Sequence, residues 1–197
     1  MLGLQLPTDP RWVDLASKQI DEILIDHAYC EQKAASTCIS LIQRFPEHRK
    51  LVEELSPVVT EEWGHFRLVL RHLHKRGYEL GRQRKDEYVH ALIAFSKQHQ
   101  GQGRKEMLLD KLLMAALIEA RSCERFKLLW QHFEDRDQDL AHFYKELMIA
   151  EANHYTLFLD LAKEYLPEEQ VRARWKEWLD YEAKVLQELK VRGDRVH

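Results

Sequence analysis

Residues 61–66 read EEWGHF and residues 150–155 read AEANHY, and each stretch contains a glutamate followed three positions later by a histidine. On an α-helix, side chains at positions i and i+3 project from one face, so each pair can reach one metal ion. The spacing alone is a weak signal, because a third copy, Glu87 to His90, occurs elsewhere in the chain. Two further glutamates, placed symmetrically about predicted turns, distinguish the first two copies.

The first copy has a partner glutamate at nearly the same distance from a turn. Glu31 precedes Pro46 and Glu62 follows it, and the two separations along the chain differ by a single position. Because a helix rises about 1.5 Å per residue, antiparallel helices that meet at Pro46 hold the two glutamates at about the same height. His65, one turn beyond Glu62, joins them on the same helix face.

The second copy repeats this arrangement. Glu119 precedes Asp135, in a stretch typical of a turn, and Glu151 follows Asp135 at an identical separation. Each predicted hairpin therefore supplies one glutamate and one Glu-x-x-His pair, which is the ligand set of di-metal carboxylate proteins of the ferritin-like class. Glu87 has no glutamate at an equal distance, so Glu87 and His90 are predicted to lie on the surface.

Composition and helical periodicity predict an all-α fold in a single domain over residues 1–197. Glycine (7) and proline (5) are scarce, which disfavours folds rich in turns. Two helical hairpins joined by a crossover of roughly 28 residues are the connectivity of a ferritin-like four-helix bundle. We expect an irregular start that ends at Pro7 and Pro10, a break or kink near Pro57, and a helix cap at Asp137 or Asp139. The predicted core helices cover residues 18–45, 47–76, 105–133 and 138–165, and outer helices cover residues 86–97 and 167–190.

The predicted core positions of these glutamates indicate a bound cation. An unpaired buried carboxylate costs several kcal/mol, so it protonates or binds a cation. Four carboxylates and two imidazoles, with no thiolate, suit iron or manganese. The alternatives are a metal-free bundle and a polar bundle whose carboxylates pair with Arg121 and Arg125. The candidate metal ligands are Glu31, Glu62, His65, Glu119, Glu151 and His154.

Four segments, in their order and spacing, carry a resemblance to one family. The segments are DHAYCEQKAAST (26–37), EEWGHF (61–66), IEARSCERF (118–126) and AEANHY (150–155). From about Pro7 to Tyr165 the chain resembles the bacterial tRNA-(2-methylthio-N6-isopentenyladenosine) hydroxylases. This resemblance implies a non-haem di-iron, O2-dependent monooxygenase that hydroxylates the isopentenyl group of a modified adenosine next to the tRNA anticodon, at nucleotide 37.

The same resemblance implies two iron ions per chain, held by the six candidate ligands, and no further catalytic residue. O2 is the implied co-substrate. An external reductase or ferredoxin-type electron donor is implied too, because the chain has no recognisable flavin, nicotinamide or iron–sulfur motif. The alternative function is ferritin-like or rubrerythrin-like iron oxidation, storage or peroxide scavenging, although the absence of a C-x-x-C pair disfavours the rubrerythrin version.

A basic segment separates the two predicted hairpins. Residues 67–105 contain ten lysines and arginines and three acids, so their local charge is +7 in a chain of net charge −3. This asymmetry predicts contact with tRNA phosphates, and His72, His74 and Tyr78 add groups that can stack on bases. A solvated crossover loop is the alternative. The candidate RNA-binding residues are Arg67, Arg71, Lys75, Arg76, Arg82, Arg84, Lys85, Arg104 and Lys105.

Gly64 stands inside a predicted helix, where glycine costs about 1 kcal/mol relative to alanine. This position indicates either space for O2 or substrate beside the metal or close packing between two helices. Four tryptophans are expected to pack in the core or between helices: Trp63, Trp130, Trp175 and Trp178.

Targeting and membrane-spanning features are not recognisable in the sequence. The first ten residues, MLGLQLPTDP, lack Lys and Arg and make a poor signal peptide. The longest dense apolar run, residues 112–118, is too short to cross a bilayer. The three cysteines form no C-x-x-C pair and are expected to be reduced thiols. These features predict a cytoplasmic protein without a membrane partner.

Overall fold

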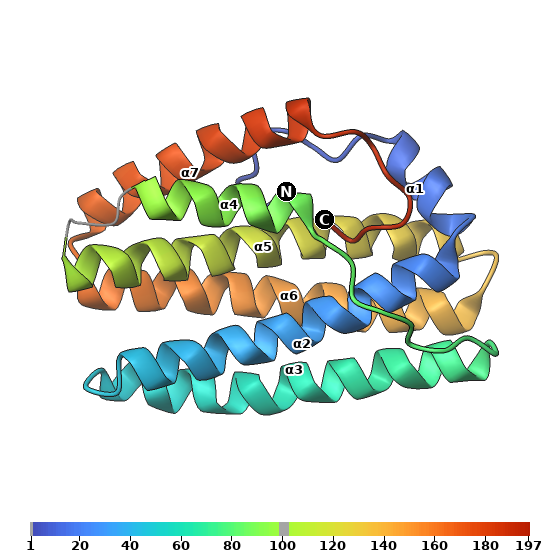
Figure 1. Ribbon diagram of the computed structural model, residues 1–197, viewed down its shortest axis with the longest axis horizontal. Helices are drawn as coiled ribbons and strands as arrows, with labels where there is room; N and C mark the ends of the chain where they lie inside the picture. Colours follow the sequence, from blue (N-terminus) through green and yellow to red (C-terminus); the bar gives the residue numbers. More distant parts are fainter. Residues whose placement is uncertain (1, 99–102) are drawn as a thin grey trace. The chain divides into compact units, whose positions relative to one another are not determined.

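The computed structural model describes residues 2–98 and 103–197, and within these ranges it contains seven α-helices and no strand (Figure 1). The chain forms two compact units, each built on a pair of long helices. The α2–α3 unit comprises residues 14–85 and 192–196, and the α5–α6 unit comprises residues 1–13, 86–191 and 197. The helices are α1 (Arg11–Ser17), α2 (Ile20–Arg44), α3 (Arg49–Lys75), α4 (Glu87–Gln98), α5 (Arg104–Phe133), α6 (Gln138–Tyr165) and α7 (Glu168–Glu188).

Each predicted core helix and outer helix is present. The ends of the helices differ from the predicted ends by no more than two residues. The loop expected at residues 99–104 lies largely outside the described residues. Proline, glycine and turn-forming acids therefore marked the helix ends well in this chain.

The irregular start expected up to Pro10 is followed by α1, a short helix that was not predicted from the sequence. Asp9 begins the helix: its Oδ1 accepts the Arg11 N–H at 2.9 Å, and its carbonyl accepts the Trp12 N–H at 2.9 Å. Pro10 suits the first turn, where a helix does not use the missing N–H. The side chain of Trp12 is 1% exposed and anchors the helix.

α3 runs without a break through Pro57, so the break expected there does not occur. A proline inside a helix removes one backbone hydrogen bond. Its neighbours Leu55 and Val58 are 0% and 4% exposed, and their packing keeps the helix continuous. They belong to a buried row that recurs every three or four positions and continues through Glu62, Phe66 and Val69. Glu62 therefore occupies a core position.

Gly77 ends α3 in a left-handed conformation. Its φ is +76°, its N–H donates to the His74 carbonyl at 3.0 Å, and the Tyr78 N–H donates to the Leu73 carbonyl at 3.0 Å. These two bonds are those of a Schellman cap, in which glycine avoids the steric cost of a Cβ at positive φ. Gly64, by contrast, lies within α3, and a Cβ built on it has no neighbouring atom within 4 Å.

We therefore expect opposite effects from two glycine-to-alanine substitutions. Gly77→Ala should lower the free energy of unfolding by about 1 kcal/mol, because alanine is strained at positive φ. Gly64→Ala should raise it by a similar amount, about 1 kcal/mol, because alanine favours the helix. Urea unfolding of the metal-free chain measures both values. A loss of stability in both variants would contradict the placement of Gly64 within a helix with open space for a Cβ.

α5 and α6 form the second hairpin, and Asp137 caps α6, as one of the two sequence alternatives predicted. The Asp137 carboxylate accepts the N–H groups of Asp139 and Leu140 at 3.1 Å each. The buried row of α6 has a spacing of three or four residues and includes two of the candidate ligands. The row contains Leu140, Tyr144, Leu147, Glu151, His154, Phe158 and Leu161.

α4 and α7 pack against α5 and against each other (Figure 1). Phe95 of α4 joins them: its ring stacks on Tyr181 with 4.2 Å between centroids and meets Trp178 edge-on at 4.8 Å. Trp178 is fully buried, as expected from its sequence. Both predicted outer helices therefore pack on α5, and α7 also contacts α6.

A buried ionic network ties α7 to α5. Arg121 and Glu182 are both 0% exposed, and the Glu182 Oε1 atom accepts from Arg121 Nε at 3.0 Å and Nη2 at 2.7 Å. The Tyr88 hydroxyl donates to the same oxygen at 3.2 Å. Arg121 also pairs with Glu124. Arg121 therefore pairs with two glutamates that are not predicted metal ligands, as its helical spacing from Glu119 indicates.

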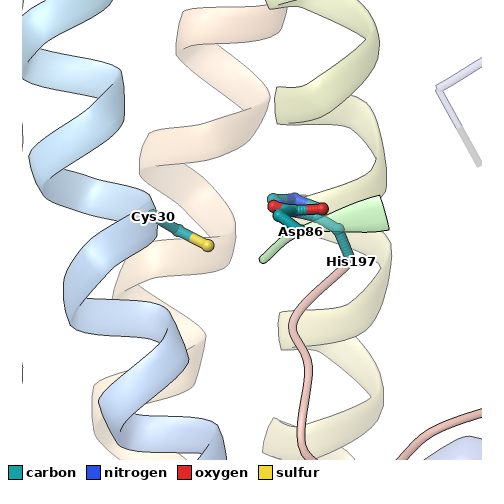
Figure 2. Close-up of side chains that lie close together, drawn as sticks. All are labelled: Cys30, Asp86 and His197. Carbon is teal, nitrogen blue, oxygen red and sulfur yellow. The ribbon is translucent and has the colours of Figure 1, made fainter. Parts of the chain in front are cut away.

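The last residue of the chain is held within the α5–α6 unit. The imidazole of His197 lies beside Asp86 (Figure 2), and its Nδ1 atom is 3.9 Å from Asp86 Oδ2. The ring stacks on Tyr88 with 5.5 Å between centroids, and its Nε2 atom is 2.9 Å from the Ser122 hydroxyl oxygen. These contacts fix the end of the chain against α4 and α5.

Two further expectations concern cysteines and membranes. All three cysteines carry free thiols, as expected from their number and spacing. Among the helices of the described ranges, none combines the length and apolar character that a bilayer crossing requires.

Candidate metal centre

The α2–α3 unit brings three predicted ligands together. Glu31 comes from the middle of α2, Glu62 and His65 come from α3, and one ligand atom of each lies within 4.8 Å of the others. The His65 Nδ1 atom is 3.6 Å from Glu31 Oε2 and 3.5 Å from Glu62 Oε2. Both carboxylates are buried, with 3% and 1% exposed. Nearly equal distance from Pro46 therefore brought the two glutamates to one height, as predicted.

This trio requires a positive charge. Burial and the neighbouring Glu62 raise the pKa of Glu31 well above its usual value. Burial alone would lower the pKa of His65, but hydrogen bonds and attraction from Glu31 and Glu62 raise that pKa to about 10. Two carboxylates this close in a buried site are stable only with a proton or a cation between them. A divalent metal ion meets the same requirement.

His27 is a candidate functional residue that the sequence analysis missed. Its Nε2 atom is 2.5 Å from Glu31 Oε1, and its side chain is fully buried. Burial, helped by the charge of His65, lowers the pKa of His27 to about 3. In the tautomer that carries its proton on Nε2, the neutral imidazole donates a hydrogen bond that orients the Glu31 carboxylate. The spacing of four residues between His27 and Glu31 on one helix was the available signal.

The α5–α6 unit gathers the other three predicted ligands. Glu119 comes from α5 and Glu151 and His154 come from α6, and one ligand atom of each lies within 4.8 Å of the others. Their exposed fractions are 6%, 3% and 3%. The second hairpin therefore repeats the ligand types and the burial of the first.

Cys123 lies one turn beyond Glu119 on α5, yet it does not have the character of a metal ligand. Its Sγ donates to the Met148 carbonyl at 3.3 Å. Burial raises the pKa of the Cys123 thiol to about 11, and only the deprotonated thiolate binds metals strongly. Cys123 therefore packs α5 against α6.

The donor chemistry of the two trios fits iron or manganese. Each trio offers two carboxylates and one imidazole, a combination of hard and borderline ligands without a thiolate. Glu62 on α3 and Glu151 on α6 occupy buried rows that are largely apolar, where uncompensated carboxylates would be costly.

The third Glu-x-x-His pair lies on the surface, as predicted. Glu87 and His90 are both exposed in the first turn of α4. Asp86 caps this turn by accepting the Val89 N–H at 3.0 Å. Glu87 and His90 therefore provide a matched control for the buried pairs.

Most of the predicted RNA-binding side chains are exposed, but they are spread over both units. Two lie at the start of α5 in one unit, whereas the others lie on α3 or in the segment that follows it. The exposed residues of this set are Arg67, Arg71, Lys75, Arg82, Lys85, Arg104 and Lys105.

The remaining two arginines of this set bind the protein itself. Arg84 pairs with Glu22 and donates to the backbone carbonyls of Glu22 at 3.0 Å and Asp194 at 2.9 Å. Arg76 donates to the His72 carbonyl at 3.3 Å. His72 is only 9% exposed, so the expectation that it stacks on a base is wrong. Arg84 anchors the segment after α3 to α2.

Trp63 lies on the surface, contrary to the expectation that it packs in the core. Its side chain is 46% exposed. Gly64 is also exposed, with no atom within 4 Å of an added Cβ, so close helix packing does not explain it. Helical geometry turns positions 63 and 64 away from Glu62 and His65. One side of α3 therefore carries ligands, and another faces solvent.

Comparisons with known proteins agree on one family. A sequence model of the family described as tRNA-(MS[2]IO[6]A)-hydroxylase (MiaE) matches residues 2–197. A Pseudomonas putida protein named tRNA 2-(methylsulfanyl)-N(6)-isopentenyladenosine(37) hydroxylase is 38% identical, over 82% of this chain and 76% of its own length. A Salmonella typhimurium protein of the same name is 25% identical, over 93% of this chain and 83% of its own length.

A solved structure is similar to almost the whole chain. It is described as "Protein 43 with aldehyde deformylating oxygenase activity from Synechococcus", and it matches with a TM-score of 0.89 and 35% sequence identity. The match covers 98% of this chain and 94% of the other. The all-α, ferritin-like fold class predicted from the sequence is thereby confirmed.

Proposed function

The chain belongs to the tRNA-(MS[2]IO[6]A)-hydroxylase (MiaE) family, and from this membership we propose that it is a non-haem di-iron, O2-dependent monooxygenase acting on tRNA. The proposed reaction hydroxylates the isopentenyl side chain of 2-methylthio-N6-isopentenyladenosine at nucleotide 37, the nucleoside in the names of two relatives. The observation that carries the proposal is the presence of one buried trio of two carboxylates and one imidazole in each unit.

Six residues are proposed to hold two iron ions, three residues from each unit. The bound iron would supply O2 activation and electron transfer, while the protein supplies binding and orientation. The four carboxylates offset the positive charge of the metal. The His27 Nε2 atom contacts Glu31 Oε1, which leaves Oε2 on the side of His65. Burial of the trios excludes water from the reacting groups. The proposed ligands are Glu31, Glu62, His65, Glu119, Glu151 and His154.

An external reductase or ferredoxin-type protein is proposed as the electron donor. Hydroxylation places one atom of O2 in the substrate and reduces the other to water, so electrons must enter from outside. The three cysteines are dispersed free thiols, which fits a chain that does not hold its own iron–sulfur centre. A tRNA substrate supports a cytoplasmic location for the proposed reaction.

Aldehyde deformylation is the second candidate function. It is favoured by the Synechococcus protein, which is 35% identical to this chain over nearly its whole length and has that activity. The two candidates differ in substrate class, since one acts on a modified tRNA and the other on an aldehyde. The family match over residues 2–197 favours tRNA.

One experiment separates these candidates and the storage alternative. The iron-loaded protein is incubated with O2, a reductant and tRNA that carries the modified adenosine, and the tRNA is then digested to nucleosides for mass spectrometry. We expect the modified nucleoside to gain one oxygen atom. Unchanged tRNA together with deformylation of an added aldehyde would favour the second candidate. Unchanged substrates with continued iron uptake and oxidation would favour storage.

A further inference from the structure

The two most exposed large aromatic side chains among the described residues lie at the two ends of one stretch of sequence. Trp63 on α3 is 46% exposed, and Tyr78, directly after the cap of α3, is 37% exposed. Tryptophan in a small helical protein is mostly buried. Its exposure beside two proposed ligands therefore requires an explanation.

Cations lie between these aromatic residues. Residues 63–78 contain four lysines and arginines and no aspartate or glutamate. Trp63, Arg67 and Arg71 are spaced by four residues, so they follow one side of the helix. Arg67 and Arg71 are exposed and form no ion pair with any residue that the structure describes. We call the solvent-facing row of Trp63, Arg67 and Arg71 the α3 stripe.

The indole of the α3 stripe has support from the core. Phe66 is 8% exposed, and its ring lies 4.8 Å from the Trp63 ring between centroids, at an interplanar angle of 34°. The buried phenylalanine restricts the motion of the indole on one side and leaves nearly half of it open to solvent. A large aromatic surface that is already ordered loses little entropy when a planar ligand stacks on it.

We propose that the α3 stripe binds an unpaired RNA loop, in which one base stacks on Trp63 while Arg67 and Arg71 contact the flanking phosphates. This inference rests on the proposed tRNA function and names the surface that would hold the tRNA. A base in a duplex has its faces covered by its neighbours, whereas unpaired bases in loops can splay out onto aromatic side chains. The combination of aromatic platform and free cations is typical of single-strand binding.

Trp63 lies between Glu62 and His65 in sequence but projects from another side of α3. The stacked base is therefore a different base from the one whose side chain is modified. Trp63 acts as a positioning residue that holds the loop on α3. The nearest acid after the stripe, Glu79, lies 4.0 Å from His74 and not beside Arg67 or Arg71.

Binding of unmodified RNA tests this surface without any catalytic step. The probes are a stem–loop with an anticodon-arm sequence and a blunt duplex of the same length. Trp63→Ala should weaken binding of the stem–loop by roughly 5- to 150-fold, the fold-change equivalent to losing one stacked base, and should hardly change binding of the duplex. Arg67→Ser with Arg71→Ser should flatten the salt dependence by about 0.7 log unit per lost phosphate contact on a single strand.

Trp175 on α7 provides the matched control. It is also a partly exposed tryptophan near cations, Arg172 and Lys176, but Glu168 and Glu169 lie in the same surface hollow. Trp175→Ala should leave stem–loop binding unchanged. Trp63→Phe, which keeps an aromatic ring, should retain most of the binding that Trp63→Ala loses.

The outcomes separate this inference from the proposed function. Equal stem–loop binding by Trp63→Ala and the unchanged protein would overturn the proposal that the α3 stripe binds an RNA loop, even if tRNA is hydroxylated. Equal weakening of stem–loop and duplex binding would overturn the stacking role. Selective loss of stem–loop binding supports the stripe whether or not the nucleoside assay supports hydroxylation. Iron content and circular dichroism confirm that each variant is folded.

Discussion

Glu119→Ala should abolish hydroxylation and reduce iron binding to well below two ions per chain. Glu119 is 6% exposed and lies within 4.8 Å of ligand atoms of Glu151 and His154. Loss of groups that merely orient metal ligands costs about 10- to 100-fold in metal affinity or activity, so loss of a proposed ligand should cost at least about 100-fold. Iron per chain by elemental analysis and hydroxylated nucleoside by mass spectrometry measure the two effects.

Glu87→Ala is the matched control for this prediction. Glu87 belongs to the third Glu-x-x-His pair, but it is exposed at the start of α4. The variant should keep both its iron and its activity, because an exposed carboxylate is already hydrated and binds no buried cation. Equal losses in Glu119→Ala and Glu87→Ala would refute the assignment of the buried trios as the metal centre.

The proposed ligands could be predicted from sequence because helices are regular. Glu31 and Glu62 are almost equally far from Pro46, and an antiparallel hairpin turns equal distance in sequence into equal height. Glu62 and Glu151 also occupy rows that are otherwise apolar and recur every three or four residues. Symmetry and periodicity therefore identified each trio separately, without any knowledge of contacts between residues far apart in sequence.

Side-chain contacts over long sequence distances could not be predicted in this way. Arg84 was grouped with the other basic residues, but it anchors to Glu22 and Asp194, which are 62 and 110 residues away. No local pattern identifies such partners. Helical spacing turns Arg121 away from Glu119, but it does not identify the partner Glu182, which lies 61 residues along the chain on α7.

The error on Trp63 has a different cause. Its expected burial followed from residue type, because tryptophan is mostly buried in proteins. The sequence already indicated which side of α3 faces the core. Glu62 and His65 lie on that side, and a helix turns about 100° between neighbouring residues. Position 63 therefore had to turn away from Glu62. Helix phase was more informative than residue type at this position.

The buried ion pair between Arg121 and Glu182 leads to the second large expected effect. Arg121→Met should lower the free energy of unfolding by about 3–5 kcal/mol, because it leaves a buried carboxylate without its main partner. Urea unfolding monitored by circular dichroism measures the change. Arg172→Met is the control, since Arg172 forms an exposed pair with Glu168 on α7 and exposed pairs contribute little.

The pH dependence of the Arg121→Met variant follows from the environment of Glu182. Burial already raises the pKa of Glu182, and attraction from Arg121 and Arg125 together with hydrogen bonds from Arg121 and Tyr88 opposes this effect. Without Arg121 the pKa of Glu182 should rise further in the folded state, so the folded chain binds an additional proton above the unfolded pKa. Stability should then decrease as the pH rises through the folded pKa.

The loss of unfolding free energy in Arg121→Met should therefore be smaller in mildly acidic buffer than at neutral pH. The double variant Arg121→Met with Glu182→Leu removes the charge of Glu182 too, so it should recover the part of the lost stability that comes from the unpaired Glu182 and lose the pH dependence that Glu182 causes. Glu124 still lacks Arg121 in both variants. The prediction fails if the free energy of unfolding of Arg121→Met at neutral pH is within about 1 kcal/mol of that of the unchanged protein, because removing one partner of a buried ion pair costs several times more. Such a result would show that Arg125 and Tyr88 stabilise the Glu182 carboxylate without Arg121.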